Sequence, residues 1–372
     1  MQKRTHKLVL FGLAMVGLIL AGCASTRTAS AAKPIELVWP DPPQVPRIKY
    51  VRSIRYMEDV RGEPSWIGKI VRSILGRSRE KLLKPYGIAT DGAGRIYAAD
   101  TAKRMIYRFD LEKRQIYRYE EFQPCGGGNR KNRRSFVSRL LSGQEEMALL
   151  SPIGVAMDRS GNLYVADSVR RRVYVFDEKG QCLREIGSDE ELERPSGIAI
   201  SRKTGRLYVT DTAGHKIVVY DTDGSRVFEF GRRGDKPGEF NFPTNIFVDT
   251  NDRIYVMDSL NFRVEVFTSE GELLSYFGQL GKVSGTFNKP KGIAVDSEGH
   301  IYVVDALFDA VQIFDGSGRL LLAFGESGAG EGEFWLPSGI HIDEKDTIYV
   351  SDSYNTRVQI FQYLKQHPVG EP

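Results

Sequence analysis

Three polar side chains with complementary chemistry lie within six residues near the end of the chain. The stretch DSYNTRVQIF, residues 352–361, contains Asp352, Asn355 and Arg357. A carboxylate, an amide and a guanidinium this close could form a catalytic constellation, clamp a charged ligand, or hold a turn in shape. Nearly the same phrase recurs as DSVRRRVYVF (167–176), DTAGHKIVVY (211–220) and DSLNFRVEVF (258–267). A catalytic site needs each group once, so the repetition favours a structural role.

The repeated phrase therefore predicts a set of scaffold residues. A carboxylate at the end of a strand accepts backbone N–H bonds from the loop that turns there, and a nearby cation compensates its charge. The predicted scaffold carboxylates are Asp100, Asp167, Asp211, Asp258, Asp305 and Asp352, and the predicted cations are Arg172, Lys216, Arg263 and Arg357. Met105 and Ala310 occupy the cation position in the other two copies.

Other residues on the same loops differ between copies, as expected for residues that are free to contact a partner. These candidate binding residues are Arg170, His215, Asn261, Phe308, Tyr354 and Asn355. A strongly basic segment, predicted as an insertion over residues 123–150, adds Arg130, Lys131, Arg133 and Arg134. Anionic lipid, phosphate groups of a polymer or an acidic protein would satisfy these charges, and a solvated loop is the alternative.

Histidine and cysteine give weaker signals. His215, His300, His341 and His367 fall at unrelated positions with no His-x-His or HExxH spacing. His341 replaces an alanine of the repeat and is a weak candidate metal ligand, or else a hydrogen-bonded lining residue. No catalytic residue can be named, no cofactor is predicted apart from a covalent lipid, and we expect a binding protein rather than an enzyme.

The elements that carry these residues repeat six times. PYGIATD (85–91) returns with its proline at 152, 195, 243, 290 and 337, and each copy precedes further short runs such as IYVVD, VQIFD and LLLAF. Runs of about five residues rich in Ile, Val, Tyr and Phe, separated by Asp-x-x-Gly turns, are typical of strands in hairpins. A four-stranded unit repeated every 43 to 48 residues after the first spacing predicts an all-β, six-bladed β-propeller.

The sixth copy ends before a fourth strand, which would leave an unpaired edge. RIKYVRSIRY (47–56) has the alternation of a strand and is predicted to complete that blade. The propeller is thus expected over residues 47–364, with a tail at 365–372. The stretch SWIGKIVRSILG (65–76), inside an insertion at 62–84, has a helical apolar stripe that would dock on the propeller or lie on a membrane.

The six leading prolines, five of them in a P-x-G phrase, and the six Tyr-x-x-Asp phrases resemble NHL repeats over residues 85–364. The resemblance implies a six-bladed propeller with variable loops on one face. Some cytosolic NHL domains bind RNA, one NHL-like propeller is a metal-dependent lyase acting on peptidyl-hydroxyglycine, and other six-bladed propellers are calcium-dependent lactonases. A metal-dependent lyase or lactonase with its site at the central channel is therefore the alternative to a binding protein.

The N-terminal segment predicts export and lipidation. A basic MQKRTHK precedes the apolar run LVLFGLAMVGLIL, and LAGC (20–23) resembles the lipobox of bacterial lipoproteins. We expect residues 1–22 to be a signal peptide, Cys23 to carry the lipid, and residues 23–46 to be a flexible proline-rich tether. Ala24 favours the outer membrane, facing the periplasm; an ordinary signal peptide with a chance cysteine is the alternative.

Processing would also change the charge. The formal net charge of +4 includes three basic residues in the signal peptide, so 49 basic and 48 acidic residues would remain. A nucleic-acid partner is therefore not expected. Cys125 and Cys182 could form one disulfide in an oxidising compartment or remain separate thiols. The sequence thus predicts a monomeric, membrane-anchored propeller that binds a protein or anionic polymer through its loops.

Overall fold

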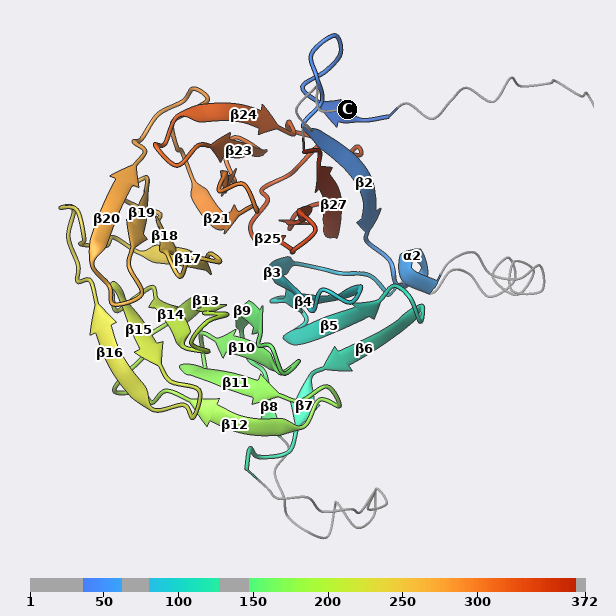
Figure 1. Cartoon of the computed structure of the whole chain (residues 1–372). Helices are drawn as coiled ribbons and strands as arrows, with labels where there is room; N and C mark the ends of the chain where they lie inside the picture. The colour runs from blue at the N-terminus through green and yellow to red at the C-terminus, as the bar shows by residue number, and fades with distance from the viewer. Residues whose placement is uncertain (1–35, 62–79, 127–146, 366–372) are drawn as a thin grey trace, which may run out of the picture. The chain divides into compact units, whose positions relative to one another are not determined.

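The computed structural model describes residues 36–61, 80–126 and 147–365. The described residues from Leu37 onward belong to one compact unit, in which six antiparallel sheets are set around a central channel and a seventh sheet consists of two short strands (Figure 1). Five of these sheets have four strands, and the sixth has a fifth strand at its outer edge. The predicted fold class, an all-β six-bladed propeller, is confirmed.

Blades one to five use their strands in chain order from the channel outward, and the first three strands of blade six do the same (Figure 1). The first strands are β3 (Pro85–Thr90), β9 (Pro152–Met157), β13 (Pro195–Ile200), β17 (Pro243–Val248), β21 (Pro290–Val295) and β25 (Ile340–Ile342). The second strands are β4 (Arg95–Asp100), β10 (Leu163–Asp167), β14 (Leu207–Asp211), β18 (Ile254–Asp258), β22 (Ile301–Asp305) and β26 (Thr347–Asp352).

The outer two strands of each blade follow the same order. The third strands are β5 (Met105–Asp110), β11 (Arg172–Phe176), β15 (Lys216–Tyr220), β19 (Arg263–Phe267), β23 (Ala310–Phe314) and β27 (Arg357–Tyr363). The fourth strands of blades one to five are β6 (Gln115–Tyr119), β12 (Cys182–Ile186), β16 (Arg226–Phe230), β20 (Leu273–Phe277) and β24 (Leu320–Phe324).

Burial explains the composition of the strands. Every residue of β18 and β19 is buried, because neighbouring blades cover these strands on both faces. The fourth strand β20 exposes Leu274 and Tyr276 at the rim, where only one face is covered. Large aromatic side chains fill the gaps between blades; for example, the Phe240 and Phe267 rings lie 5.6 Å apart.

An N-terminal strand closes the ring, as predicted. β2 (Ile48–Ile54) pairs antiparallel with β27 and supplies the fourth strand of blade six. The predicted start of the folded part at Arg47 is wrong, however, because β1 (Val38–Trp39) pairs with β2 inside the stretch expected to be tether. The Trp39 ring lies 5.7 Å from Phe324 and 5.8 Å from Phe361, so this residue is anchored by packing.

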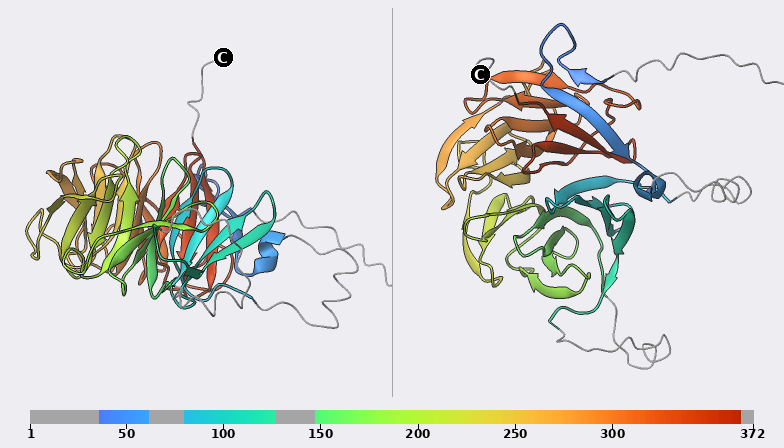
Figure 2. Two further views of the ribbon diagram at one scale, coloured as in Figure 1. Left: turned by 90° about the horizontal axis from the view of Figure 1, so that it is seen from below. Right: turned by 45° about the vertical axis from the view of Figure 1, so that its right-hand side comes forward.

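The strands run between two opposite faces of the ring, where the turns collect (Figure 2). We call one the loop face. It carries the turns between second and third strands, at residues 101–104, 168–171, 212–215, 259–262, 306–309 and 353–356, and the connections that enter each blade. The turn face carries the connections between first and second strands and between third and fourth strands.

The glycine of the P-x-G phrase allows the first strands to approach one another at the loop face. A Cβ on Gly154 would collide with the carbonyl oxygen of Ser196 in the next blade, and one on Gly339 would collide with that of Tyr86. A larger residue at either position would push neighbouring blades apart. The P-x-G repeat is thus a packing requirement of the ring.

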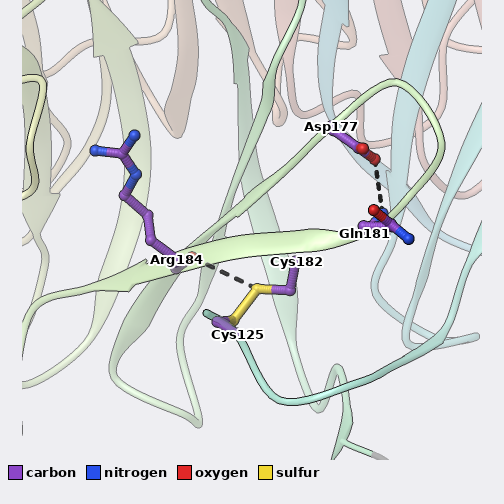
Figure 3. Close-up of a disulfide and its surroundings, with 5 residues drawn as sticks. All are labelled: Cys125, Asp177, Gln181, Cys182 and Arg184. Atoms are coloured by element: carbon purple, nitrogen blue, oxygen red, sulfur yellow. Dashed lines mark hydrogen bonds between the residues drawn. A yellow bond between two sulfur atoms is a disulfide. The ribbon is translucent and has the colours of Figure 1, made fainter. Parts of the chain in front are cut away.

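Blade two is covalently tied to the predicted basic insertion. The short strands β7 (Glu121–Phe122) and β8 (Met147–Ala148) pair at its base, and a disulfide joins Cys125 to Cys182 of β12 (Figure 3). The Phe122 ring packs 5.0 Å from Tyr174 and 5.1 Å from Phe176. Residues 127–146 lie outside the described part, including the predicted contacts Arg130, Lys131, Arg133 and Arg134.

Several other predictions also concern residues that are not described. These are the signal peptide, Cys23, the helical stripe at 65–76 and most of the C-terminal tail. The short helix α2 (Met57–Arg61) precedes the predicted helical insertion, and residues 80–84 at its end are not helical. No helix in the described ranges is long and apolar enough to cross a membrane.

Candidate functional site

The six repeated aspartates hold the loop that enters each blade. All six side chains are fully buried. Asp100 accepts the backbone N–H groups of Leu83 (2.7 Å) and Lys84 (3.1 Å), just before the proline of its own blade. Asp167, Asp211 and Asp305 accept the corresponding pairs, and Asp258 and Asp352 accept one each from Asn241 and Trp335. This geometry serves as scaffold in every blade.

The cations of the repeated phrase divide into two groups. Arg263 and Arg357 lie 3.2 Å and 2.7 Å from the aspartates of their own blades. Arg172 instead pairs with the exposed Asp189, and Lys216 pairs with Glu229. The predicted compensation of the buried aspartate by the cation therefore holds in blades four and six and is wrong in blades two and three. There, backbone N–H groups provide the compensation.

Arg357 joins three parts of blade six. Its Nε donates to Asp352, and its two Nη atoms donate to the carbonyl oxygens of Ala329, Gly330 and Glu333 at 2.6 to 3.1 Å. The side chain is only 4% exposed. A planar guanidinium can satisfy all four acceptors at once, so Arg357 braces the connection that leads into its blade.

Two candidate binding residues belong to the same brace. Asn355 donates through Nδ2 to Gly328 O (2.7 Å) and to Asp352 (2.9 Å). Asn261 makes the equivalent bonds in blade four, to Gly234 O (2.9 Å) and Asp258 (2.6 Å). Their amides are already engaged, so the prediction that they are free to bind a partner is wrong. They vary between blades because the connections they hold also vary.

His215 is likewise a structural residue. It is buried, and its Nδ1 lies 3.2 Å from the backbone N–H of Phe242, the residue before the proline of the next blade. Asp309, at the same position of its turn, accepts the backbone N–H of Leu336 at 2.7 Å. Both residues have positive φ, as does every residue at this position. The prediction that His215 is a partner contact is wrong because it supports the neighbouring blade.

Three candidates remain to be placed. Arg170 donates from Nε and Nη2 to Ala148 O, at 3.2 and 3.1 Å, and so holds the base of the insertion. Phe308 is partly exposed. Tyr354 is 48% exposed, and its ring lies 5.6 Å from the exposed ring of Trp335. Of the predicted partner contacts in the described ranges, only Tyr354 and Phe308 still offer surface without a bracing role.

Exposed apolar side chains gather on the loop face. In the described part of the chain, the large exposed apolar residues of this face are Tyr56, Leu83, Val169, Leu260, Leu280, Val283, Leu307, Trp335 and Tyr354. None lies in a blade turn of the turn face within the described ranges; Val45, in the connection between β1 and β2, is the nearest case. Within the described ranges, the two faces therefore differ in the large exposed apolar side chains that they carry, and the remaining ones lie on the outer strands.

Basic side chains surround the channel where it opens on the loop face. Lys84, Arg194 and Lys289 each precede the proline of a first strand, and Lys291 follows one. Sequence reasoning missed these residues and Trp335. A signal for them was present in the sequence. The positions directly before and after the repeated proline vary between copies, whereas the proline is kept.

The channel itself encloses about 450 Å³ and is lined by the first strands. Its wall combines polar groups with apolar side chains such as Val155, Ile246 and Val295. Toward the turn face, Asp296, Glu298 and Glu344 line it. A small or extended ligand could enter such a space, held by polar groups near the two ends.

Blade four contains a buried carboxylate with an unusual environment. Glu265 accepts the backbone N–H of Gly238 through Oε2, and its Oε1 lies 2.5 Å from Nη2 of Arg263 without a hydrogen bond. Burial raises the pKa of Glu265 to about 7. In blade six, Gln359 occupies the same position and donates from Nε2 to Glu333 O at 2.6 Å, a bond that an ionised carboxylate cannot make.

The Glu265→Gln variant is therefore expected to be more stable than the native chain above pH 7, by about 1 kcal/mol. The folded state binds the Glu265 proton more tightly than the unfolded state, so this carboxyl stabilises the fold below about pH 4.5. That contribution is lost as pH rises through 7. Urea denaturation across this range should show a flatter pH profile in Glu265→Gln. Gln359→Glu is the matched reverse change and should steepen it; equal profiles would contradict the assignment.

Comparison with known proteins now places the chain. Residues 141–224, 188–272 and 295–367 match the sequence profile of family DUF5128, described as a 6-bladed beta-propeller, and together they span more than half of the chain. The chain belongs to this family. No curated protein matches it.

Solved structures similar to this family member share its fold at low identity. A gluconolactonase from Xanthomonas campestris superposes with a TM-score of 0.56 and 15% identity, covering 85% of this chain and 98% of its own. An auxiliary nutrient binding protein from Bacteroides thetaiotaomicron gives 0.55 and 13%, covering 77% and 70%. A virginiamycin B lyase from Staphylococcus aureus gives 0.52 and 15%, covering 76% and 95%. These likenesses show the fold alone.

The described residues show the surroundings of His341, the weak candidate metal ligand of the channel. His341 lines it, and its Nε2 lies 3.0 Å from the hydroxyl oxygen of Thr90. Burial lowers the pKa of His341 to about 4, so the ring is neutral at physiological pH. No group of three or more His, Cys, Asp or Glu side chains is placed to hold a metal among the described residues. His341 has the surroundings of a hydrogen-bonded lining residue.

Proposed function

We propose that the chain is a lipid-anchored binding propeller of the bacterial cell envelope that captures a partner on its loop face. The observation that carries this proposal is that nine large exposed apolar side chains of the described ranges lie on that face, whereas the others lie on outer strands and in the connection between β1 and β2. Exposed apolar side chains gathered on one face of a domain are typical of a site that meets another molecule. The turn face, by contrast, is built from short polar turns that need no partner.

The shape of the loop face supports a rigid docking surface. Buried carboxylates fix each connection through short hydrogen bonds, for example Asp305 to Asn288 at 2.7 Å. Arg357 and Arg263 add further bonds to carbonyl groups of the connections. These hydrogen bonds already order the loops in the free protein. Binding of a partner would therefore cost little conformational entropy in the loops.

Anchoring is supported by the N-terminal sequence. The basic segment, apolar run and LAGC phrase would deliver Cys23 to lipidation in the envelope. Two or three acyl chains hold a protein stably at a membrane. The segment between Cys23 and Leu37, rich in small and polar residues, would then let the propeller reach a partner at a short distance from the lipid.

Site-specific photo-crosslinking in intact cells tests the proposal. A photoreactive amino acid at Leu260 or Leu307, both about half exposed on matched turns of the loop face, should give a discrete crosslinked product. Lys179 and Lys345, exposed on the turn face, are the control positions. Mass spectrometry identifies the product. Equal capture from both faces, or none from the loop face, would contradict the proposal.

A further inference from the structure

The basic side chains at the loop-face mouth of the channel are held in place by the scaffold. The backbone N–H groups of Lys84, Arg194 and Lys289 donate to buried aspartates at 3.1, 2.8 and 2.9 Å. Their side chains are nevertheless exposed. The fold thus fixes the main chain of each residue while leaving its charge free to meet a ligand.

Aromatic rings lie among these cations. Nζ of Lys291 lies 6.0 Å from the ring centroid of Tyr86, which lines the channel, although the two residues belong to blades five and one. Nζ of Lys84 lies 5.9 Å from the ring centroid of Tyr354, beside Trp335. Blade six lies between blades one and five, and its own residue at the mouth is the small, buried Ser338. The cations and rings of blades one and five therefore lie on either side of blade six, whose own side chain at the mouth is small.

In the described structure no anion lies at hydrogen-bond distance from these positive charges, although the buried Asp305 acts on Lys291 and favours its charged form. None of Lys84, Arg194, Lys289 and Lys291 forms a salt bridge or a side-chain hydrogen bond with another described residue, whereas the buried Arg263 and Arg357 pair with carboxylates and donate to backbone carbonyl groups. Burial, Lys289 and Lys84 lower the pKa of Lys291 to about 8. Gathering unpaired like charges around a half-buried amine is unfavourable, and a bound anion would relieve it.

The surroundings indicate which anion. Leu260, Leu307 and the Trp335–Tyr354 pair extend aliphatic and aromatic surface around the basic mouth. Interfaces with nucleic acid are more polar and more extensively basic than this. A protein segment that combines carboxylates with apolar side chains matches both features.

We propose that the channel mouth on the loop face is a binding site for an acidic protein segment. A carboxylate of the partner is held by Lys84, Lys289 and Lys291 beside Tyr86, and a neighbouring apolar side chain packs on Trp335 and Tyr354. This inference rests on the proposed function, since it names the chemistry of the partner that the loop face captures.

Fluorescence anisotropy with the full chain tests the site. The probe is a labelled peptide, Ser-Glu-Leu-Glu-Phe-Glu-Ser, and its counterpart has glutamine in place of every glutamate. We expect the acidic peptide to bind at least about tenfold more tightly than the glutamine peptide and to weaken as salt is raised. The double variant Lys289→Met and Lys291→Met should lose about tenfold in affinity, because it removes two contacts between a cation and a carboxylate of the peptide.

Matched variants and a second readout keep the test decisive. Lys179→Met with Lys345→Met removes the same charge from the turn face and should leave the affinity unchanged. An anion would raise the pKa of Lys291, so binding at pH 8 should take up a proton, and affinity should fall between pH 8 and 10. Calorimetry in buffers of different ionisation enthalpy measures that proton, which Lys291→Met should abolish.

Three results would overturn the inference. They are no binding of the acidic peptide to the unaltered chain, equal affinity in the Lys289 and Lys291 double variant, and tighter binding of an oligothymidylate of equal charge. If crosslinking from Leu260 and Leu307 still captures a partner in any of these cases, the proposed function stands and only the acidic site fails. If crosslinking also fails, the proposed function falls with it.

Discussion

A chain lacking residues 37–54 is expected to melt more than about 10 °C below the full chain, or to lose cooperative unfolding altogether. The deletion removes β1 and β2, and with β2 the fourth strand of blade six. Ile48 and Ile54 are completely buried, and burying two such side chains stabilises a fold by about 3–6 kcal/mol. That is a large part of the free energy of unfolding of an ordinary domain.

The deletion also exposes an edge. β27 would present unpaired N–H and C=O groups along seven residues, which invites association between chains. Differential scanning calorimetry and light scattering would measure both effects. Within β2, Ile54→Asp should reproduce most of the loss, whereas Val51→Asp, at a half-exposed position of the same strand, should change little. An unchanged melting temperature in the deletion would show that β2 does not close the ring.

The Arg357→Ala variant is expected to lower the free energy of unfolding by about 3–5 kcal/mol. The change would leave the buried Asp352 without its cation and would remove three hydrogen bonds to carbonyl groups of the connection. Arg357→Lys should rescue little, because one ammonium group cannot reach the four acceptors that the planar guanidinium satisfies. Urea denaturation with the transition followed by tryptophan fluorescence measures the difference.

Arg172→Ala provides the matched control. Arg172 occupies the same position in blade two, but its guanidinium contacts the exposed Asp189 and its own neighbour Arg171. A surface ion pair of this kind contributes about 1 kcal/mol or less. If Arg172→Ala were as destabilising as Arg357→Ala, the two arginines would have the same role and the division of the repeated phrase into two groups would be wrong.

The repeat made the fold predictable. Six leading prolines and six aspartates required the same local structure six times, and the missing fourth strand in the last copy identified residues 47–56 as its replacement. The strand at Val38–Trp39 was not predicted, because it lies in a proline-rich stretch whose composition is typical of a flexible tether. The packing of Trp39 against Phe324 and Phe361 holds this stretch on the propeller despite its composition.

The candidate site was less predictable, for two physical reasons. Asn261, Asn355 and His215 vary between blades, which suggested binding, yet each braces a connection whose own length and course vary. The mouth of the channel is a property of the closed ring. Lys291 and Tyr86 are some two hundred residues apart in the chain and meet only because blades one and five both flank blade six.

The scaffold role of the repeated aspartates is visible in the structure, but the identity of a partner depends on which exposed groups gather on one face. Leu307 is unremarkable in sequence, as one leucine in a turn. It becomes informative only beside Leu260, Tyr354 and Trp335 on the same face of the propeller. The repeated sequence thus predicts the propeller fold, and closure of the propeller brings together the side chains of the loop face.

The crosslinking comparison between the two faces tests the central claim most directly. The quantity measured is the ratio of crosslinked product from Leu307 to that from Lys345, at equal expression in intact cells. The account predicts a discrete product from Leu307 and none above background from Lys345. A ratio near one, or a product from Lys345 alone, would contradict capture of a partner on the loop face.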